Sequence, residues 1–565
     1  ALDRSLRNTS LISGALQEDR TTGQDVLAAA RADYARLLGA LYDLGYYDSV
    51  VNITLDGVEA AAIAPLDAPA EVRHVVIAVQ PGRQFTFSRA AIAPLVPGTT
   101  ADDDYAAGQM AGTGIIRSAA TQAVRDWRDH GHAKADVSGQ QITADHPSQT
   151  VDSQIALAPG PVVTFGPLHV SGFERMNERR LRKIAGYPEG ARFDPEELDT
   201  VRKRLRRTGI FSAITLTEAD VLNADNSMDM DLAVIEQKPR RIGAGFEISN
   251  TEGVMISAYW LHRNLRGGGE RLRIDGSVSD IGARDSGQDY SLGARLERPA
   301  TFHPDVTAYL AADVARMREV DYDSDTVSLS FGANYIHSDR LTGDMALQYV
   351  ASRVTDETGK NNFRVLALPS RLTFDARDEP TDARKGYWIE GRFTPFYGFS
   401  DTGSGAQIIG ETRVYRSFGT EDRITLAGRA RAGTVIGPDI QETPRDYLFY
   451  SGGGGTVRGQ PYQSLGVEVI QGPDGPVKTG GMSATTLSAE IRWRVRERVG
   501  VVAFADAGQV WTEGSFGGDA DWHSGAGLGV RYATPIGPLR FDIAAPVGGD
   551  TGDGVQVYLG LGQAF

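Results

Sequence analysis

The feature that most constrains the fold is an alternation of period two that fills the second half of the 565-residue chain. From Arg240 onward, about sixteen segments of roughly ten residues alternate apolar and polar side chains, with Gly, Asp, Asn or Pro between them. In residues 487–495, Leu, Ala, Ile, Trp and Val alternate with Ser, Glu and Arg. This pattern predicts a transmembrane β-barrel with an apolar face toward lipid and a polar lumen. A soluble sandwich also alternates, but its inner face rarely carries so many charges.

The length of this half fits a closed barrel, because residues 241–565 allow about 20 residues for each of sixteen strands and its connection. An even strand count leaves both barrel ends on one side, so the long connection 438–479 is predicted to be an external loop that folds inward. The predicted strands are 240–250, 253–264, 270–284, 288–300, 305–318, 324–337, 341–355, 363–377, 385–398, 406–419, 423–437, 480–495, 499–511, 522–535, 537–548 and 554–565.

The first 239 residues follow a different pattern, in which helical periodicity alternates with short strands. Each of three copies has a glycine that ends a helix and a proline that closes the last strand, and successive prolines are 78 and 80 residues apart. The glycines are Gly45, Gly131 and Gly209, and the prolines are Pro81, Pro159 and Pro239. The repeat predicts three α+β modules with the order strand, helix, helix, strand, strand.

The predicted domains are modules 1–82, 83–160 and 161–239, followed by the barrel, 240–565. The chain begins almost directly in a predicted helix, Leu6–Leu16, so the first module lacks its opening strand. We therefore expect residues before Ala1 to be missing from this sequence.

Composition excludes several other classes. No run of 18 apolar residues occurs, which argues against a helical membrane protein. The net charge of −15 argues against nucleic-acid binding, which needs a basic surface. The chain has no cysteine, which suits an oxidising compartment.

Candidate metal and catalytic motifs are weak, so we expect no catalytic residue, no cofactor and no metal. The nine histidines lack ligand spacing. Asp321–Asp325 begins like a calcium loop but lacks the glycine and the distal glutamate. Two basic stretches, Arg179–Lys183 and Arg202–Arg207, are either solvated helix faces or contacts with anionic lipid headgroups or a partner.

The long loop carries the most specific motif, Val457-Arg458-Gly459, after the run Gly452–Gly455. A phosphate-binding loop would need Lys-Ser/Thr after the glycines, and none follows. The motif resembles the loop motif of the outer-membrane insertase and two-partner-secretion superfamily. Further similar segments are Phe504-Ala505-Asp506-Ala507-Gly508, the hairpin 529–542 and the terminal Phe565. Gln460 departs from the family, which usually has an aromatic there, so the resemblance does not predict how this position of the loop tip packs.

The resemblance implies that the modules are POTRA domains, and three of them with a sixteen-stranded barrel resemble the TamA family. It implies an outer-membrane protein of a Gram-negative bacterium, with periplasmic modules, that assists folding and insertion of β-barrel proteins and autotransporters. The implied partners are unfolded outer-membrane clients, the lipid bilayer and a TamB-like inner-membrane-anchored periplasmic protein, with a monomeric barrel and no nucleic acid. The alternative is a two-partner-secretion-type polypeptide export pore.

Two groups of site residues follow. A guanidinium can pair bidentately with lumenal carboxylates on adjacent strands, so Arg458 is expected to pair with Asp506, with Glu490 sharing it. The simpler interpretation is a solvated loop arginine. A lateral seam is expected between the first and last barrel strands, where a client strand could add to the opened edge. The seam residues are Gly243, Gly245, Phe246, Ile248, Gly560, Gly562 and Phe565.

Overall fold

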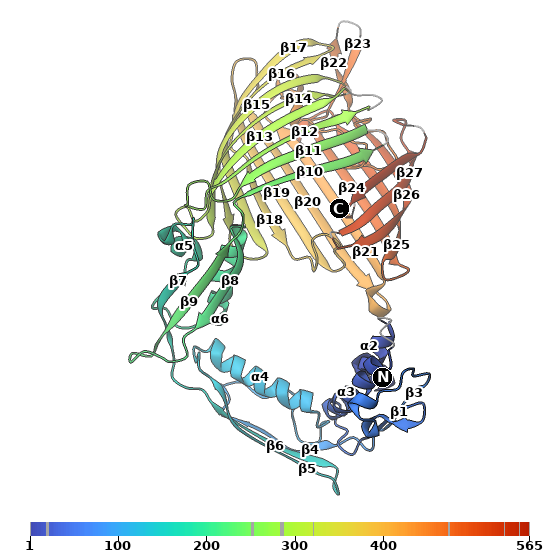
Figure 1. The fold of residues 1–565 in the computed structure, drawn as a ribbon. Coiled ribbons are helices and arrows are strands. Elements are labelled where there is room, and N and C mark those ends of the chain that lie inside the picture. Colours follow the sequence, from blue (N-terminus) through green and yellow to red (C-terminus); the bar gives the residue numbers. More distant parts are fainter. Residues whose placement is uncertain are drawn as a thin grey trace. The chain divides into compact units, whose positions relative to one another are not determined.

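The computed structural model describes residues 2–17, 22–249, 253–282, 287–319, 321–472, 475–535, 537–552 and 554–563. These residues form two compact units (Figure 1). The N-terminal unit comprises residues 1–169, 187–200 and 215–232, and the barrel unit comprises residues 170–186, 201–214 and 233–565. The division passes through the third predicted module, and the predicted domain boundaries remain predictions.

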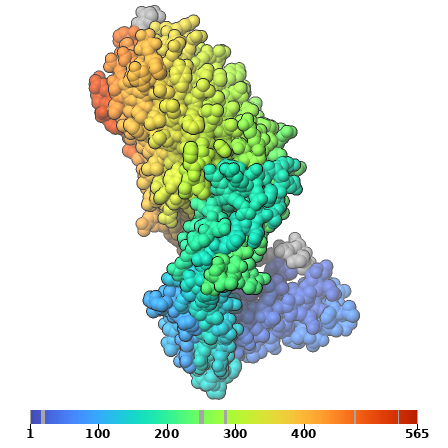
Figure 2. Space-filling model, turned by 90° about the vertical axis from the view of Figure 1, so that its left-hand side faces the viewer, coloured from blue at the N-terminus to red at the C-terminus, as the bar shows by residue number. Residues whose placement is uncertain are grey.

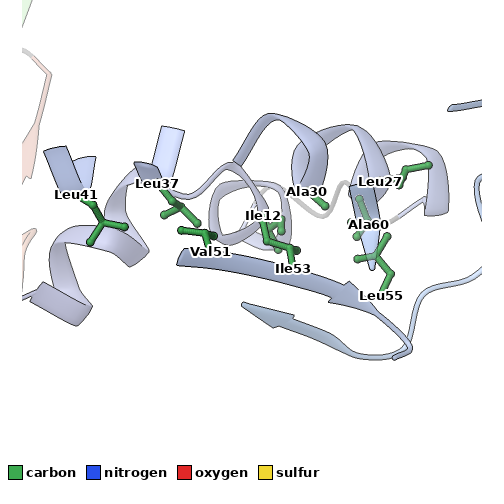
Figure 3. Packing of buried hydrophobic residues seen from close by; sticks show 10 residues of the cluster. Ile12, Leu27, Ala30, Leu37, Leu41, Val51, Ile53, Leu55 and Ala60 are labelled. Atoms are coloured by element: carbon green, nitrogen blue, oxygen red, sulfur yellow. The ribbon is translucent and has the colours of Figure 1, made fainter. Parts of the chain in front are cut away.

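The first module packs one long helix, α3 (Gly23–Asp43), on a small sheet of order β2-β1-β3. Helix α3 begins after Thr22, whose side chain caps the Asp25 N–H, and buries apolar residues spaced three or four apart. These pack against the alternate residues of β1 that face inward (Figure 3). The strands are β1 (Val50–Leu55), β2 (Val58–Glu59) and β3 (Val75–Gln80), and short 3-10 turns span Ala60–Ala62 and Pro65–Asp67.

The predicted helix Leu6–Leu16 is two helices, α1 (Leu2–Thr9) and α2 (Leu11–Gln17), which corrects the expectation. The break is explained by Asp33 of α3, which is fully buried. Its carboxylate accepts hydrogen bonds from the Ser10 hydroxyl at 2.7 Å and from the backbone N–H groups of Leu11 and Ile12. It therefore caps the start of α2, where a continuous helix would leave this buried acid without those donors.

The second module has one helix where two were predicted. Its sheet has the order β4-β6-β5, and α4 packs Ile116, Ala119 and Ala123 onto it. Residues 94–112 contain no helix, which follows from their glycines and three successive aspartates, all poor helix formers. The elements are β4 (Thr86–Ala93), α4 (Thr113–Asp129), β5 (Asp136–Asp145) and β6 (Thr150–Ala158).

The third module has the element order that the repeat predicted. Its sheet has the order β7-β9-β8. The elements are β7 (Thr164–Ser171), α5 (Glu178–Ala185), α6 (Pro195–Arg207), β8 (Phe211–Glu218) and β9 (Ser227–Glu236). None of the helices among the described residues is both long and apolar enough to cross a bilayer.

The rest of the chain forms a closed antiparallel barrel of seventeen described segments. Figure 2 shows part of its outer surface, where residues from the middle of the chain are coloured green, yellow and orange. The segments are β10 (Arg240–Ser249), β11 (Gly253–His262), β12 (Arg271–Ile281), β13 (Asp289–Arg298), β14 (Val306–Arg318), β15 (Asp323–Ile336), β16 (Leu341–Asp356), β17 (Gly359–Ala367), β18 (Ser370–Asp375), β19 (Gly386–Gly398), β20 (Gly405–Phe418), β21 (Ile424–Ile436), β24 (Ser483–Arg494), β25 (Val499–Trp511), β26 (Ala520–Thr534), β27 (Gly537–Gly548) and β28 (Gln556–Leu561).

The predicted strand 363–377 is the one that the structure corrects most. It consists of β17 and β18, which both pair with β16 and β19. The break falls at Leu368 and Pro369, and proline has no N–H to donate to a sheet ladder. The two segments therefore share one place in the wall.

The alternation places apolar side chains outside and polar side chains inside. In β24, Leu487, Ile491 and Trp493 are each more than half exposed, whereas Ser488 and Glu490 are buried. Lipid covers such an outer face in a transmembrane barrel.

Candidate functional site

The connection between β21 and β24 folds back and carries the Val457-Arg458-Gly459 motif. Backbone hydrogen bonds join Ser451 and Leu465 in both directions, at 3.0 and 2.9 Å, and close the base of the tip. Beyond the tip the connection forms a hairpin that was not predicted, β22 (Val467–Gly472) with β23 (Gly475–Thr479). Short 3-10 turns at Ile440–Glu442 and Arg445–Tyr447 precede the tip.

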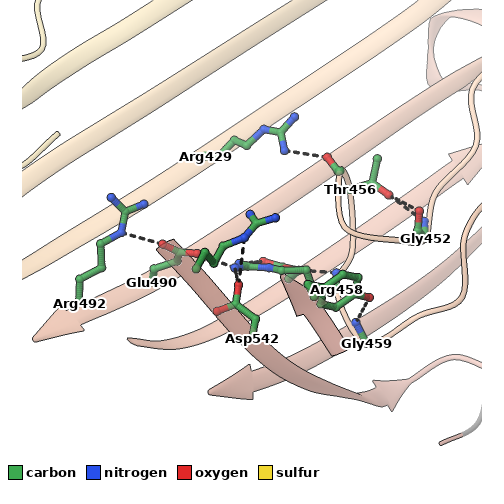
Figure 4. A network of polar contacts seen from close by, with 12 residues as sticks. Arg429, Gly452, Thr456, Arg458, Gly459, Glu490, Arg492 and Asp542 are labelled. Atoms are coloured by element: carbon green, nitrogen blue, oxygen red, sulfur yellow. Dashed lines mark hydrogen bonds and ion pairs between the residues drawn. The ribbon is translucent and has the colours of Figure 1, made fainter. Parts of the chain in front are cut away.

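Arg458 lies in the lumen against the two carboxylates that the sequence suggested. Its Nε and Nη2 donate to the two oxygens of Asp506 at 2.7 and 2.9 Å, and its Nη1 donates to Glu490 at 2.6 Å. All three side chains are at most 3% exposed. Figure 4 shows Arg458 together with Glu490. The guanidinium also lies 3.6 Å from the ring centroid of Phe504. Arg458 is therefore a buried anchor and not a solvated loop arginine.

The charge network extends to residues that the sequence analysis missed. Asp542 of β27 lies 3.6 Å from Arg458 and forms an ion pair with Arg531 of β26. Arg492 donates to the second oxygen of Glu490 at 2.7 Å. Alternation in β27, where Leu539, Phe541 and Ile543 are lipid-facing, was the signal that places Asp542 in the lumen.

Glycines in the wall allow the loop to approach closely. A Cβ on Gly525 would lie 2.0 Å from the carbonyl oxygen of Arg458, and one on Gly508 would lie 2.2 Å from the Ser451 hydroxyl. Gly459 itself has φ +94°, and a Cβ there would meet the backbone of Ala545 at 2.6 Å. Side chains at these positions would push the loop away from the wall.

Gln460 replaces the aromatic contact with hydrogen bonds. Its side chain is fully buried and donates to the carbonyl oxygens of Ser524 and Gly548, at 2.8 and 3.2 Å. Its oxygen accepts from Thr551 at 3.1 Å. Position 460 of the loop tip is therefore held by hydrogen bonds to the wall.

A buried Ser451–His523 pair also secures the loop. The two side chains are hydrogen-bonded at 2.8 Å, and His523 contacts the Thr551 hydroxyl at 2.7 Å. Ser451 is 1% exposed, so this serine is not accessible to a substrate. Among the described residues, no group of three or more His, Asp or Glu side chains is placed to hold a metal.

The barrel is closed weakly where its first and last segments meet. Strand β10 forms ten residue pairs with β11, from Arg240 to Ser249, and β27 forms six with β28. Between the described residues of β10 and β28, one pair is present, Ser249 with Tyr558. Strand β28 is six residues long beside the 12 residues of β27.

The predicted seam residues are placed differently from one another. Phe246 is 66% exposed on the outer face of β10. Gly243 and Gly245 leave room for the side chains of Tyr259 and Ser257 on β11. Their lack of a side chain therefore favours close pairing of β10 with β11. Gly560 adjoins Arg540 of β27.

Gly562 follows β28 with φ +92°, and its N–H donates to the carbonyl oxygen of Pro538 at 2.7 Å. The backbone of Ile248 pairs with Val254 of β11. Phe565 lies outside the described residues.

The basic helices of the third module contact turns of the barrel within the barrel unit. Arg204 and Arg207 bind Asp305 at 2.7 and 2.8 Å, and Arg180 donates to the carbonyl oxygen of Pro299. Burial raises the pKa of Asp305, but the two arginines outweigh it and hold this pKa below its usual value. These arginines therefore dock the helices onto the β13–β14 turn.

The connection between β21 and β24 that carries Arg458 is also fixed by ion pairs at the other end of the barrel, away from the β13–β14 turn. Arg445 binds Asp356 at 2.9 Å, with both side chains almost fully buried, and Lys478 lies 3.4 Å from Asp321. Burial, followed by the charges of Asp289, Asp280 and Asp446, raises the pKa of Glu319 to about 7.

The chain is similar to known proteins in sequence and in fold. Residues 264–565 match the Omp85 superfamily domain. The outer membrane protein assembly factor BamA of Nitratidesulfovibrio vulgaris is 23% identical over 470 residues, covering 78% of this chain and 56% of the relative. BamA of Neisseria meningitidis serogroup B is 20% identical over 496 residues, covering 77% and 60%. The chain thus spans less than two thirds of the length of these relatives.

Two solved structures have a similar fold. BamA from Haemophilus ducreyi lacking POTRA domains 1–3 has a TM-score of 0.65 at 17% identity, covering 84% of this chain and 99% of that one. CdiB from Acinetobacter baumannii has a TM-score of 0.52 at 12% identity, covering 84% and 89%. The chain belongs to the Omp85 superfamily, as a β-barrel protein of the outer membrane whose N-terminal modules lie in the periplasm.

Proposed function

We propose that this protein is an outer-membrane protein assembly factor that folds and inserts β-barrel clients, including autotransporters, through the seam between β10 and β28. The observation that carries the proposal is the contrast between ten pairs on one side of β10 and a single described pair on the other. A strand with one weakly paired edge can accept an incoming strand through its backbone groups. The likeness to BamA relatives supports the same activity.

The finer assignment is to the TamA type. In this proposal the three modules are POTRA domains, and β17 and β18 count as one broken strand, which gives sixteen positions around the barrel. The first module would receive a TamB-like inner-membrane-anchored protein, unfolded clients would reach the seam from the periplasm, and the barrel would act as a monomer. Arg458, Asp506 and Glu490 would keep the loop in the lumen and perform no chemistry.

Photo-crosslinking in cells tests the proposal. A crosslinker at Phe246, whose side chain faces outward from β10, should capture unfolded barrel proteins, and one at Tyr47 in the first module should capture a large inner-membrane-anchored protein. The matched control is Leu329 on β15, which is also more than half exposed on the lipid-facing wall but lies away from the seam. Equal client capture at Leu329 and Phe246 would contradict the seam.

The second candidate is a two-partner-secretion-type export pore. The inward loop favours it, because release of Arg458 from the wall would open the lumen. A secreted adhesin captured at lumenal positions, with nothing captured at Phe246, would replace the first proposal with this one.

A further inference from the structure

Tyr558 of β28 belongs both to the loop site and to the seam. It is the β28 residue in the described pair with β10, opposite Ser249. On its other side it pairs with Asp542 of β27, a member of the Arg458 charge network. One line of residues therefore crosses β27, β28 and β10 from the buried charges to the seam.

The loop tip holds this tyrosine directly. The backbone N–H of Gly459 donates to the Tyr558 hydroxyl at 3.1 Å, within the motif that also supplies Arg458 (Figure 4). A Cβ on Gly454 would lie 3.2 Å from the Tyr558 ring, so the absence of a side chain at this loop position leaves room for the ring.

The tyrosine also packs against the wall that carries Arg458. It is 5% exposed and clusters with Val502, Phe504 and Ala544. Phe504 is the ring over which the Arg458 guanidinium lies. In contrast to Tyr558, Val555 and Leu559 in the same part of the chain are exposed on the lipid-facing side. Tyr558 is thus fixed from the lumen, although its strand has little support along its outer edge.

We propose that Tyr558 is the positioning residue through which the loop tip keeps the seam closed. Withdrawal of Gly459 removes the hydrogen bond to Tyr558 and frees the β28 residue that meets β10. The seam then opens more often, while β24 to β27 keep their pairing. This inference rests on the proposed function, since it assigns the regulation of the same seam.

Hydrogen exchange on the full chain in lipid nanodiscs tests the inference without a client. Tyr558→Phe removes the hydroxyl and keeps the ring. Exchange in segments 240–249 and 556–561 should become about fivefold faster, the change in opening that corresponds to about 1 kcal/mol for one lost hydrogen bond. Exchange in 499–511, the β25 segment, should stay unchanged. Tyr532→Phe, which alters a tyrosine exposed on the outer face of β26, should change neither.

Two results would overturn the inference: unchanged exchange in both seam segments, or faster exchange throughout β24 to β27, which would mean a general loss of stability. The exchange result is separable from the proposed function. If exchange responds but Phe246 captures no client, the coupling stands and the assembly function fails. If Phe246 captures clients but exchange does not respond, the assembly function stands and the coupling fails.

Discussion

The wall formed by β24 to β27 and the adjoining seam between β28 and β10 belong to one barrel, yet they are stabilised in opposite ways. The wall has long ladders and buries Arg458 among the carboxylates of Glu490, Asp506 and Asp542. The seam has one described residue pair. A barrel can thus confine opening to one place when the neighbouring strands are fixed from inside.

Removing the central cation should produce the largest effect. Arg458→Ala leaves three buried carboxylates with less compensation, and loss of one partner of a buried ion pair typically costs about 3–5 kcal/mol. Urea-dependent loss of the folded barrel, followed by electrophoretic mobility, should show this destabilisation. Arg496→Ala, at an exposed arginine in the β24–β25 turn, is the control. Equal stability of the two variants would contradict a stabilising role of the network.

Adding a side chain at the loop tip should destabilise the contact between the loop and the barrel wall, but less than Arg458→Ala does. Gly459→Ala combines a positive φ with a Cβ 2.6 Å from the backbone of Ala545, a strain of about 1–3 kcal/mol. Protease digestion from outside should cleave the loop faster in this variant. Gly455→Ala, where no atom lies within 4 Å of the added Cβ, should behave as the parent. If both variants are cleaved equally slowly, the tip does not depend on close approach.

The outer attachment of the loop should respond to pH. The pKa of Glu319 is raised to about 7, so the folded state holds a proton that the unfolded state has lost. The stability contributed by this proton is fully present below the unfolded pKa and is lost as pH rises through 7, by about 2–3 kcal/mol between pH 5 and 8. Urea unfolding of Glu319→Gln should lack this component, and exposed Glu357→Gln should retain it. An unchanged pH dependence in Glu319→Gln would be the contrary result.

Loss of the contact between residues 201–207 and the β13–β14 turn, within the barrel unit, should show the smallest effect. Asp305→Ala removes the partner of Arg204 and Arg207 and should cost about 1 kcal/mol, because this ion pair is only partly buried. Hydrogen exchange in residues 201–207 should increase. Asp339→Ala removes the exposed Lys203 pair and should leave exchange unchanged. If Asp339→Ala increased the exchange in residues 201–207 more than Asp305→Ala did, Asp305 would not be the residue that holds this helix.

Much of the barrel could be predicted because period-two alternation is local. Strand β24 was predicted within three residues of its observed bounds, and the lumenal position of Glu490 followed from its neighbours. The interruption at Pro369 also had a local signal, the missing N–H, but the alternation of apolar and polar residues does not reveal it. The loop pairing of Arg458 required the family motif, since no local rule selects partners 32 and 48 residues away.

The remaining contacts could not be derived from local patterns. The hydrogen bonds of Gln460 depend on carbonyl groups of β26 and β27 that only the folded wall exposes. The contact of Tyr558 with Gly459 joins residues 99 positions apart, so no local pattern predicts it. Gly243 and Gly245 were predicted to belong to the seam, whereas the side chains that fill the space beside them are those of Tyr259 and Ser257 on β11.

A reversible disulfide across the seam tests whether clients enter the membrane between β10 and β28. The chain contains no cysteine, so Ser249→Cys with Tyr558→Cys adds one disulfide at the described β10–β28 pair. Ala244→Cys with Ala258→Cys locks the β10–β11 ladder as a control. We expect oxidation of the first variant to stop client insertion into liposomes and reduction to restore it, while the control should insert clients in both states. Undiminished insertion with the seam locked would contradict this expectation.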